Sequence, residues 1–247
     1  MELRYESHVY TSPNGSLTRG FAQRTLWVNV SEGILKRYWG ILQENGLYVF
    51  CTQIIEFVLC SIRSGFISSK LGVKKLRIGP RSYLRGLSSI ELGEDFSAGE
   101  GLWIEAITRY NEQVFRPRIV IGRRARITKF VHIAATHFVE IGDDVLIGSK
   151  VIITDHNHGQ YSLAHSSPHL APQLRLLDHD RKVVIGRNVW LGEGVVVAPG
   201  ASIGEGSVIG ANSVVLGSIP PFTIAVGAPA KVCKVFNFET GEWKSIN

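Results

Sequence analysis

The sequence contains little cysteine, and its cysteines show no paired spacing. The three are Cys51, Cys60 and Cys233, and no two of them form a C-x-x-C pair. An odd number of widely separated cysteines argues against a disulfide-stabilised secreted scaffold. We therefore expect a protein of a reducing compartment, the cytoplasm.

The chain also lacks a long uninterrupted apolar run. Its first six residues include two Glu and one Arg, so they do not resemble a secretory signal. The most apolar stretch covers only positions 47–60 and is interrupted by Gln53 and Glu56. A membrane-spanning helix needs about 20 apolar residues. The sequence therefore predicts no transmembrane helix.

The overall composition is that of a folded protein with an uneven charge. Apolar residues make up 45% of the 247 residues and charged residues 19%, enough to build a core, and the 26 glycines favour short turns over long helices. The net charge is +6, and residues 1–77 hold ten Lys or Arg against five Glu. This basic first third fits an anionic membrane surface, a phosphorylated ligand, nucleic acid or an ordinary solvated surface.

A period of six residues dominates the second half of the chain. An aliphatic residue recurs at every sixth position from 185 to 215, and two shorter sets with a two-residue slip between them lie upstream. The members are Ile185, Leu191, Val197, Ile203, Ile209 and Val215, preceded by Ile121, Ile127, Ile133 and by Ile141, Ile147, Ile153. This period fits neither a helix nor an isolated strand. It predicts coils of three hexapeptides, with each aliphatic side chain stacked on its counterpart one coil further along the chain.

Two segments carry a resemblance to a known family. They are IGDDVLIGSKVIITDHNHG and VVIGRNVWLGEGVVVAPGASIGEGSVIGANSVVLGSIPPFTIAVGAPAKV. Both resemble the hexapeptide-repeat acyltransferases, and among these the bacterial sugar O-acetyltransferases of the galactoside and maltose type. The resemblance implies a left-handed parallel β-helix, a homotrimer, and acetyl-CoA bound along the coil in the groove between two subunits.

A long interruption of the repeat carries most of the histidines. Residues 155–182 lack the six-residue pattern and contain five of the eight histidines: His156, His158, His165, His169 and His179. In the resembling enzymes the turn TDHNHG holds the catalytic histidine. Alignment on T-x-H selects His156, whereas ungapped alignment from IGDDVLIG selects His158. We favour His156 and expect Asp155 to orient its ring.

A histidine suits the chemistry that the resemblance implies. Transfer of an acyl group to a sugar requires removal of a proton from a hydroxyl group, and a neutral imidazole is a suitable general base near neutral pH. The hydroxyl oxygen would attack the thioester carbonyl of acetyl-CoA directly, with backbone N–H groups at a turn stabilising the oxyanion.

A zinc enzyme is the alternative interpretation of the histidine cluster. The gamma-class carbonic anhydrases share the expected fold and place histidine ligands just after I-G pairs within the repeats. The residues at these positions here are Arg123, Asp143, Ser149, Arg187, Glu193, Glu205 and Ala211. Since none is histidine, we predict no metal.

The resemblance also indicates residues for the cosubstrate. Trp190, Gly192 and Ala211 match positions beside the pantetheine arm, and Lys231 and Lys234 match basic residues near the nucleotide phosphates. Relatives often have Arg at these last two positions. A Thr-Lys pair of the galactoside-type enzymes is replaced here by Leu216 and Gly217.

The acceptor side differs from that of the galactoside-type enzymes. The position of their acceptor-binding asparagine corresponds to Thr128 here. The acceptor is therefore expected to be a different sugar. His132 and His137 precede the loop and either line the acceptor side or pack within the fold.

Residues 47–71 predict a helix, because apolar residues recur at spacings of three and four after Gly46. A β-helix exposes apolar side chains at its end, so the first role expected of this helix is to cap the N-terminal coil. The second is peripheral contact with the inner membrane through its apolar and basic faces. The two roles are compatible.

The sequence thus predicts an all-β fold with an N-terminal helical cap and a protruding loop. The expected segments are 1–77, with the capping helix; 78–226, the β-helix with its loop at 155–182; and 227–247, a C-terminal tail. We predict an acetyl-CoA-dependent O-acetyltransferase acting on a sugar hydroxyl of a bacterial surface polysaccharide or its precursor. An N-acetyltransferase acting on an amino sugar is the alternative, and no nucleic-acid partner is expected.

Overall fold

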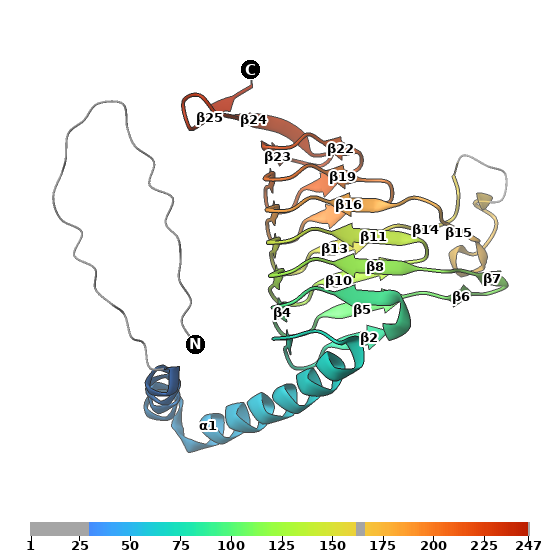
Figure 1. Cartoon of the computed structure of the whole chain (residues 1–247). Coiled ribbons are helices and arrows are strands. Elements are labelled where there is room, and N and C mark those ends of the chain that lie inside the picture. The colour runs from blue at the N-terminus through green and yellow to red at the C-terminus, as the bar shows by residue number, and fades with distance from the viewer. Residues whose placement is uncertain (1–29, 162–165, 247) are drawn as a thin grey trace. The chain divides into compact units, whose positions relative to one another are not determined.

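A computed structural model describes residues 30–161 and 166–246 of the chain. His165 and the basic residues of the first 29 positions lie outside these described residues. The chain divides into two units, Met1–Cys51 and Thr52–Asn247. The second unit contains all the strands described below, stacked as successive coils (Figure 1).

Three sheets of mostly parallel strands form the faces of the coil. The first face holds β1 (Arg77–Ile78), β4 (Ser97–Ala98), β9 (Arg126–Ile127), β12 (Leu146–Ile147), β17 (Trp190–Leu191), β20 (Val208–Ile209) and β23 (Thr223–Val226). The second holds β2 (Tyr83–Arg85), β5 (Trp103–Ala106), β10 (His132–Ala135), β13 (Ile152–Thr154), β18 (Val196–Val197) and β21 (Val214–Val215). The third holds β3 (Ile90–Leu92), β8 (Arg118–Ile121), β11 (Phe138–Ile141), β16 (Val183–Ile185), β19 (Ser202–Ile203) and β22 (Ser218–Ile219).

The six-residue period marks the residues that fill the coil. All the aliphatic side chains of the three periodic sets are buried. In the later coils Leu191 pairs with Ile209 and Val197 with Val215, which are three hexapeptides apart as predicted. In the earlier coils the two-residue slip lengthens this step, as between Ile127 and Ile147. The predicted left-handed parallel β-helix is confirmed.

Two excursions leave the coil at neighbouring corners between the second and third faces. The first is the hairpin of β6 (Arg109–Tyr110) and β7 (Gln113–Val114), which the sequence analysis did not predict. The second is the predicted loop, with β14 (Asn157–His158), the short 3-10 helix η3 (Pro172–Leu174) and β15 (Leu177–Asp178). The Gln113 amide joins them, because it donates to the Leu177 carbonyl at 3.2 Å and accepts from its N–H at 2.6 Å.

The helix α1 (Val30–Leu71) is broken at Gly46, whose φ of 76° is not helical. Its last turns close the N-terminal end of the coil, as predicted. Ile67 is buried in the same hydrophobic core as the coil residues, and Ser64 Oγ accepts a hydrogen bond from the Ile78 N–H at 3.0 Å. The Arg63 guanidinium donates to the carbonyls of Ile78 and Gly79. These contacts satisfy backbone groups that the first coil would otherwise leave unpaired.

The sequence predicted no helix that could cross a membrane. That prediction is wrong as far as length and composition go, because one helix passes both criteria. The segment Leu42–Leu71 has 30 residues, and its most apolar 18-residue window has a mean hydropathy of 1.5 and is not buried in the fold. The helix continues beyond position 60 through Ile62, Phe66 and Ile67, with Arg63 and Lys70 as the charged residues of that part. Length alone therefore does not exclude a membrane helix here.

The C-terminal end of the coil is extended by a hairpin. Strand β23 pairs antiparallel with β24 (Lys231–Asn237), which pairs in turn with β25 (Glu242–Ser245). The short 3-10 helix η1 (Leu87–Ser89) forms a corner of the first coil. Both ends of the stack are thus bordered by non-repeat segments, at one end a helix and at the other a hairpin.

Candidate active site at Asp155 and His156

Asp155 lies at the corner where the long loop leaves β13, and it is fully buried. Its carboxylate accepts hydrogen bonds from the backbone N–H groups of Thr136, His137 and Phe138, at distances from 2.8 to 3.2 Å. Burial raises the pKa of this carboxyl, but the hydrogen bonds from His156, Thr136 and His137 outweigh it and hold the pKa below its ordinary value. Asp155 is therefore a fixed negative charge at neutral pH.

The Asp155 charge faces the ring of the next residue. His156 Nδ1 lies 2.9 Å from Asp155 Oδ1 and 3.2 Å from Thr154 Oγ1, and only 11% of the side chain is exposed. A carboxylate can only accept a hydrogen bond, so the proton of the neutral ring sits on Nδ1 and Nε2 carries the lone pair. This is the arrangement of an oriented general base.

His158, the other candidate, has different surroundings. It is exposed on β14, and its Nδ1 lies 3.2 Å from the Tyr110 hydroxyl of the first excursion. The two rings are also in edge contact, with centroids 5.2 Å apart. No carboxylate contact of His158 occurs within the described residues. The structure thus joins Asp155 to His156 and places His158 with the neighbouring hairpin.

Four further side chains lie on the second face of the coil, and one of them, His132, interacts electrostatically with His156. The His132 ring stacks on Trp103 with centroids 4.2 Å apart, and Glu105 forms a 2.9 Å ion pair with Arg85. Burial lowers the pKa of His132; the Glu105 charge opposes this shift, and a proton on His156 adds to it. Within the described part of the chain His132 Nε2 is buried without a hydrogen-bond partner.

Trp103 and Glu105 were not identified from the sequence. They pair with His132 and Ala134 of the next coil, and the first excursion is inserted between these two strands. Because of this insertion the spacing between the paired residues is not a multiple of the repeat, so the pairing could not be read from the sequence. His137, by contrast, acts here through its backbone N–H on Asp155, and Thr128 contacts Ser149 through its hydroxyl at 3.0 Å.

The residues predicted for the cosubstrate lie apart from His156 within one chain. Trp190 is half exposed on β17 of the first face, whereas His156 follows β13 of the second. Lys231 and Lys234 are exposed on β24. A side chain at Gly192 would meet the Ala211 backbone N at 2.6 Å. The stacking of adjacent turns therefore already requires glycine at this position.

The remaining loop histidines do not form a metal-binding group in the part of the chain described. No cluster of three or more His, Cys, Asp or Glu suited to one metal ion occurs there. His179 contacts Asp180 at 2.9 Å and the Phe115 ring, and His169 is exposed.

Known proteins share this arrangement of repeats. The family model "Bacterial transferase hexapeptide (six repeats)" matches residues 182–217. The chain is 46% identical over 164 residues to WbbJ of Escherichia coli (strain K12), provisionally named as a lipopolysaccharide biosynthesis O-acetyl transferase, covering 66% of this chain and 80% of that protein.

A solved structure has the same fold at lower identity. It is AntD, an N-acyltransferase from Bacillus cereus in complex with dTDP and 3-hydroxybutyryl-CoA, with a TM-score of 0.54 and 20% identity over 68% of this chain and 84% of that one. At that identity the likeness concerns the fold. Together with the match to the E. coli relative over most of its length, the repeats show that the chain belongs to the hexapeptide-repeat acyltransferase family.

Proposed function

We propose that the protein is an acetyl-CoA-dependent O-acetyltransferase that modifies a sugar hydroxyl of a bacterial surface polysaccharide or its precursor. The observation that carries this proposal is the buried Asp155 carboxylate bound to Nδ1 of His156, which leaves Nε2 as the proton acceptor. The name of the E. coli relative supports an O-linked sugar product. A hydroxyl group needs such a base, because it is almost fully protonated at neutral pH.

The reaction follows from this pair. The oxygen of the sugar hydroxyl attacks the thioester carbonyl carbon of acetyl-CoA while His156 Nε2 accepts the hydroxyl proton. The carbon–sulfur bond then breaks, and the imidazolium returns the proton to the departing CoA sulfur. Asp155 stabilises the imidazolium formed between these steps, since its charge is fixed by three backbone N–H groups. No acetyl group is attached to the protein.

The cosubstrate is proposed to lie along the first face, beside Trp190 and the turns at Gly192 and Ala211. The exposed indole of Trp190 offers apolar surface to a pantetheine arm, and the ammonium groups of Lys231 and Lys234 suit the phosphates of the nucleotide. In a homotrimer, the first face of one subunit would border the second face of the next. Such packing would bring Trp190 of one copy toward His156 of another.

The acceptor is proposed to bind on the second face, on the coils that precede His156 in the chain. Trp103 is 44% exposed and offers the open part of its indole ring, between His132 and Tyr83, to a sugar. Glu105 and Arg85 offer polar partners for hydroxyl groups. His132 Nε2 is a further polar group without a protein partner in the described residues. Aromatic and charged side chains of this kind are suited to bind a carbohydrate.

The test begins with calorimetric titration of acetyl-CoA into purified protein of known metal content. Saturable binding near one molecule per subunit supports the transferase. Absence of binding, with stoichiometric zinc in the protein, would favour the alternative of a zinc enzyme like the gamma-class carbonic anhydrases. Incubation with acetyl-CoA and candidate glycans, followed by mild alkali, then identifies the product. An ester is cleaved by this treatment, whereas the amide of an N-acetyltransferase survives it.

A further inference from the structure

The second half of α1 carries an exposed apolar stripe on one side. Five large side chains of the second unit follow the i, i+3, i+4, i+7, i+11 spacing of one helix face, and each is between 47% and 68% exposed. They are Ile55, Val58, Leu59, Ile62 and Phe66. The coil-facing residues Ser64 and Ile67 lie on another side of the helix. The stripe therefore points away from the coil that the helix caps.

The charge around this stripe is mostly positive: Glu56 is exposed beside Ile55, and the charged residues that follow it are basic. From residue 57 to residue 90 the sequence has seven basic residues and no Asp or Glu: Arg63, Lys70, Lys74, Lys75, Arg77, Arg81 and Arg85. Lys70, Lys74, Lys75 and Arg77 are exposed, whereas Arg81 and Arg85 form ion pairs with Glu100 and Glu105 of the coil. An apolar helix face flanked by cations is the pattern that binds the interface of an anionic membrane.

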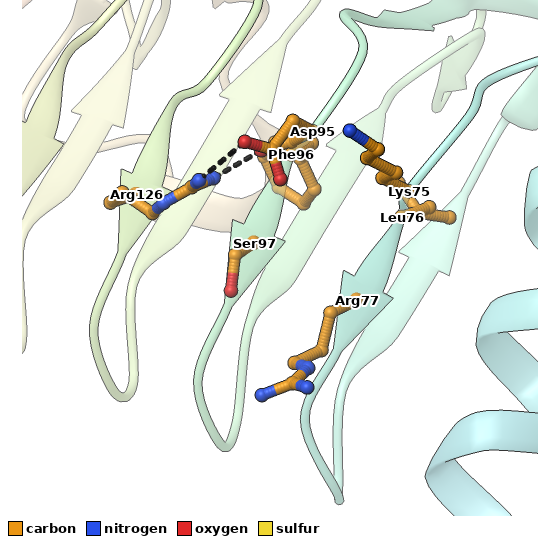
Figure 2. Close-up of a pocket in the computed structure, with 7 residues that line it drawn as sticks. All are labelled: Lys75, Leu76, Arg77, Asp95, Phe96, Ser97 and Arg126. Atoms are coloured by element: carbon orange, nitrogen blue, oxygen red, sulfur yellow. Dashed lines mark hydrogen bonds and ion pairs between the residues drawn. The ribbon is translucent and has the colours of Figure 1, made fainter. Parts of the chain in front are cut away.

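Two of these cations border a cleft on the first coils, shown in Figure 2. The cleft has a volume of about 410 Å³ and is lined by Lys75, Arg77 and Arg126, among others. Arg126 is bound by the Asp95 carboxylate at 2.7 Å, whereas the structure records no ion pair of Lys75 or Arg77 in the described chain. These two side chains are therefore available to a phosphate group outside the protein.

The helix geometry favours lying in the membrane surface over crossing the membrane. Residues 63–71 contact the coil, through Arg63, Ser64 and Ile67. The free part runs from the break at Gly46 to Ile62 and has a length of about 24 Å. The hydrocarbon core of a bilayer is about 30 Å thick, so this segment is too short to span it upright.

We propose that the stripe of Ile55, Val58, Leu59, Ile62 and Phe66 docks in the plane of an anionic lipid surface, with the neighbouring lysines and arginines on the lipid phosphates. The capping helix then serves two purposes, since one side closes the coil and the other holds the enzyme at a membrane. This proposal is independent of the proposed reaction, because lipid binding is measured without either substrate.

The test is co-sedimentation of the full chain with vesicles of phosphatidylcholine alone and with phosphatidylglycerol added. We expect binding to the anionic vesicles, weakened by high salt. The double variant Leu59→Gln with Ile62→Gln should bind about tenfold more weakly. The control is Val114→Gln with Leu174→Gln, which changes two equally exposed apolar residues elsewhere and should bind as the unaltered protein does.

Three outcomes would overturn the proposal. One is that no vesicle binds the protein, or that neutral and anionic vesicles bind it equally. Another is that the double variant keeps its lipid binding but loses its oligomeric state in light scattering, which would assign the stripe to a contact between copies. The third is that the bound protein resists extraction by alkaline carbonate, which would indicate a spanning helix.

Discussion

At the scale of single residues, the two neighbouring histidines of the loop differ in what they contact. His156 is held by a buried carboxylate, whereas His158 is exposed and contacts Tyr110. We predict that His156→Ala lowers kcat by about 10²–10⁴-fold, the usual contribution of a general base, with acetyl-CoA affinity unchanged. His158→Ala should keep most of its activity. Steady-state kinetics and calorimetry on both variants test this. An inactive His158→Ala beside an active His156→Ala would reverse the assignment.

A second prediction concerns Asp155 and pH. The pKa of the Asp155 carboxyl is lower in the folded protein than in the unfolded chain, where an aspartate titrates at about 3.9. The unfolded chain therefore binds the proton more readily at acid pH. The stability that the carboxylate contributes is complete above that value and is lost as the pH falls through the lower folded pKa.

Asp155→Asn should accordingly lower the free energy of unfolding by about 1–3 kcal/mol at pH 7, because backbone N–H groups lose charged acceptors. The difference from the unaltered protein should shrink below about pH 4. Urea unfolding at several pH values measures it. Asp180→Asn is the control, since that carboxylate is exposed and its recorded partner is the neighbouring His179. A difference that is constant with pH would contradict the assigned role.

The third prediction tests the acceptor face. Trp103→Ala removes the exposed indole surface that a sugar would contact, and we take the energy of an aromatic pair, about 0.5–1.5 kcal/mol, as the scale of the loss. We expect the KM for the acceptor to rise about threefold to tenfold, with the KM for acetyl-CoA unchanged. A rise in both constants would indicate a general distortion of the coil instead.

The candidate base was predictable because it lies within a short motif beside regular repeats. The motif alone did not separate His156 from His158, since the difference depends on the N–H groups of residues 136–138, which belong to the preceding coil. Trp103 and Glu105 were not predictable at all. Their neighbours in space are set by the length of an excursion whose sequence shows no period.

At the scale of elements, Gly192 shows how adjacent turns restrict the sequence. A Cβ at this position would lie 2.6 Å from the Ala211 backbone N, whereas nothing lies within 4 Å of one at Gly217. We predict that Gly192→Ala lowers the free energy of unfolding by about 1–3 kcal/mol, since the coils must move apart. Gly217→Ala should change it by less than about 0.5 kcal/mol.

Thermal or urea unfolding of the two variants tests this prediction, and acetyl-CoA affinity is measured alongside. If Gly192→Ala unfolds like the unaltered protein yet binds acetyl-CoA poorly, the glycine is required by the cosubstrate and not by coil stacking.

Regular elements were more predictable than excursions for a physical reason. The strands of the later coils are very short, and each inward side chain must stack on its counterpart in the next coil. Because of that requirement an aliphatic residue recurs at every sixth position of the sequence. The hairpin at Arg109–Val114 is held instead by hydrogen bonds of Tyr110, Asn111 and Gln113 with the neighbouring long loop. A few polar side chains of this kind leave no recognisable period in the sequence.

At the scale of the whole molecule, the capping helix shows what composition can and cannot decide. Its apolar character was evident, and its contact with the first coil was predicted. The sequence did not reveal that one side of the helix, with Ser64 and Ile67, contacts the coil while the stripe that ends at Phe66 stays exposed. That distinction depends on where the helix meets the coil, which only the assembled fold determines.

The separation of Trp190 and His156 on different faces has a consequence for the assembled enzyme. If acetyl-CoA lies along Trp190 and the base is His156, the two groups belong to different faces of one chain. A closed cyclic oligomer can bring them together, because each interface joins one face of a subunit to a different face of its neighbour. We therefore predict that each active site is shared between two subunits of the expected homotrimer.

Mixing two impaired variants tests the shared site. Homo-oligomers of His156→Ala lack the base, and those of Trp190→Ala combined with Lys231→Ala and Lys234→Ala lack the proposed cosubstrate contacts. After the two are unfolded and refolded together in equal amounts, random assembly should leave about a quarter of the interfaces with both sets of groups intact. Activity should then recover toward a quarter of the unaltered value. Mixtures no more active than their components would place the base and the cosubstrate within one chain, and the inferred contribution of Trp190 would be wrong.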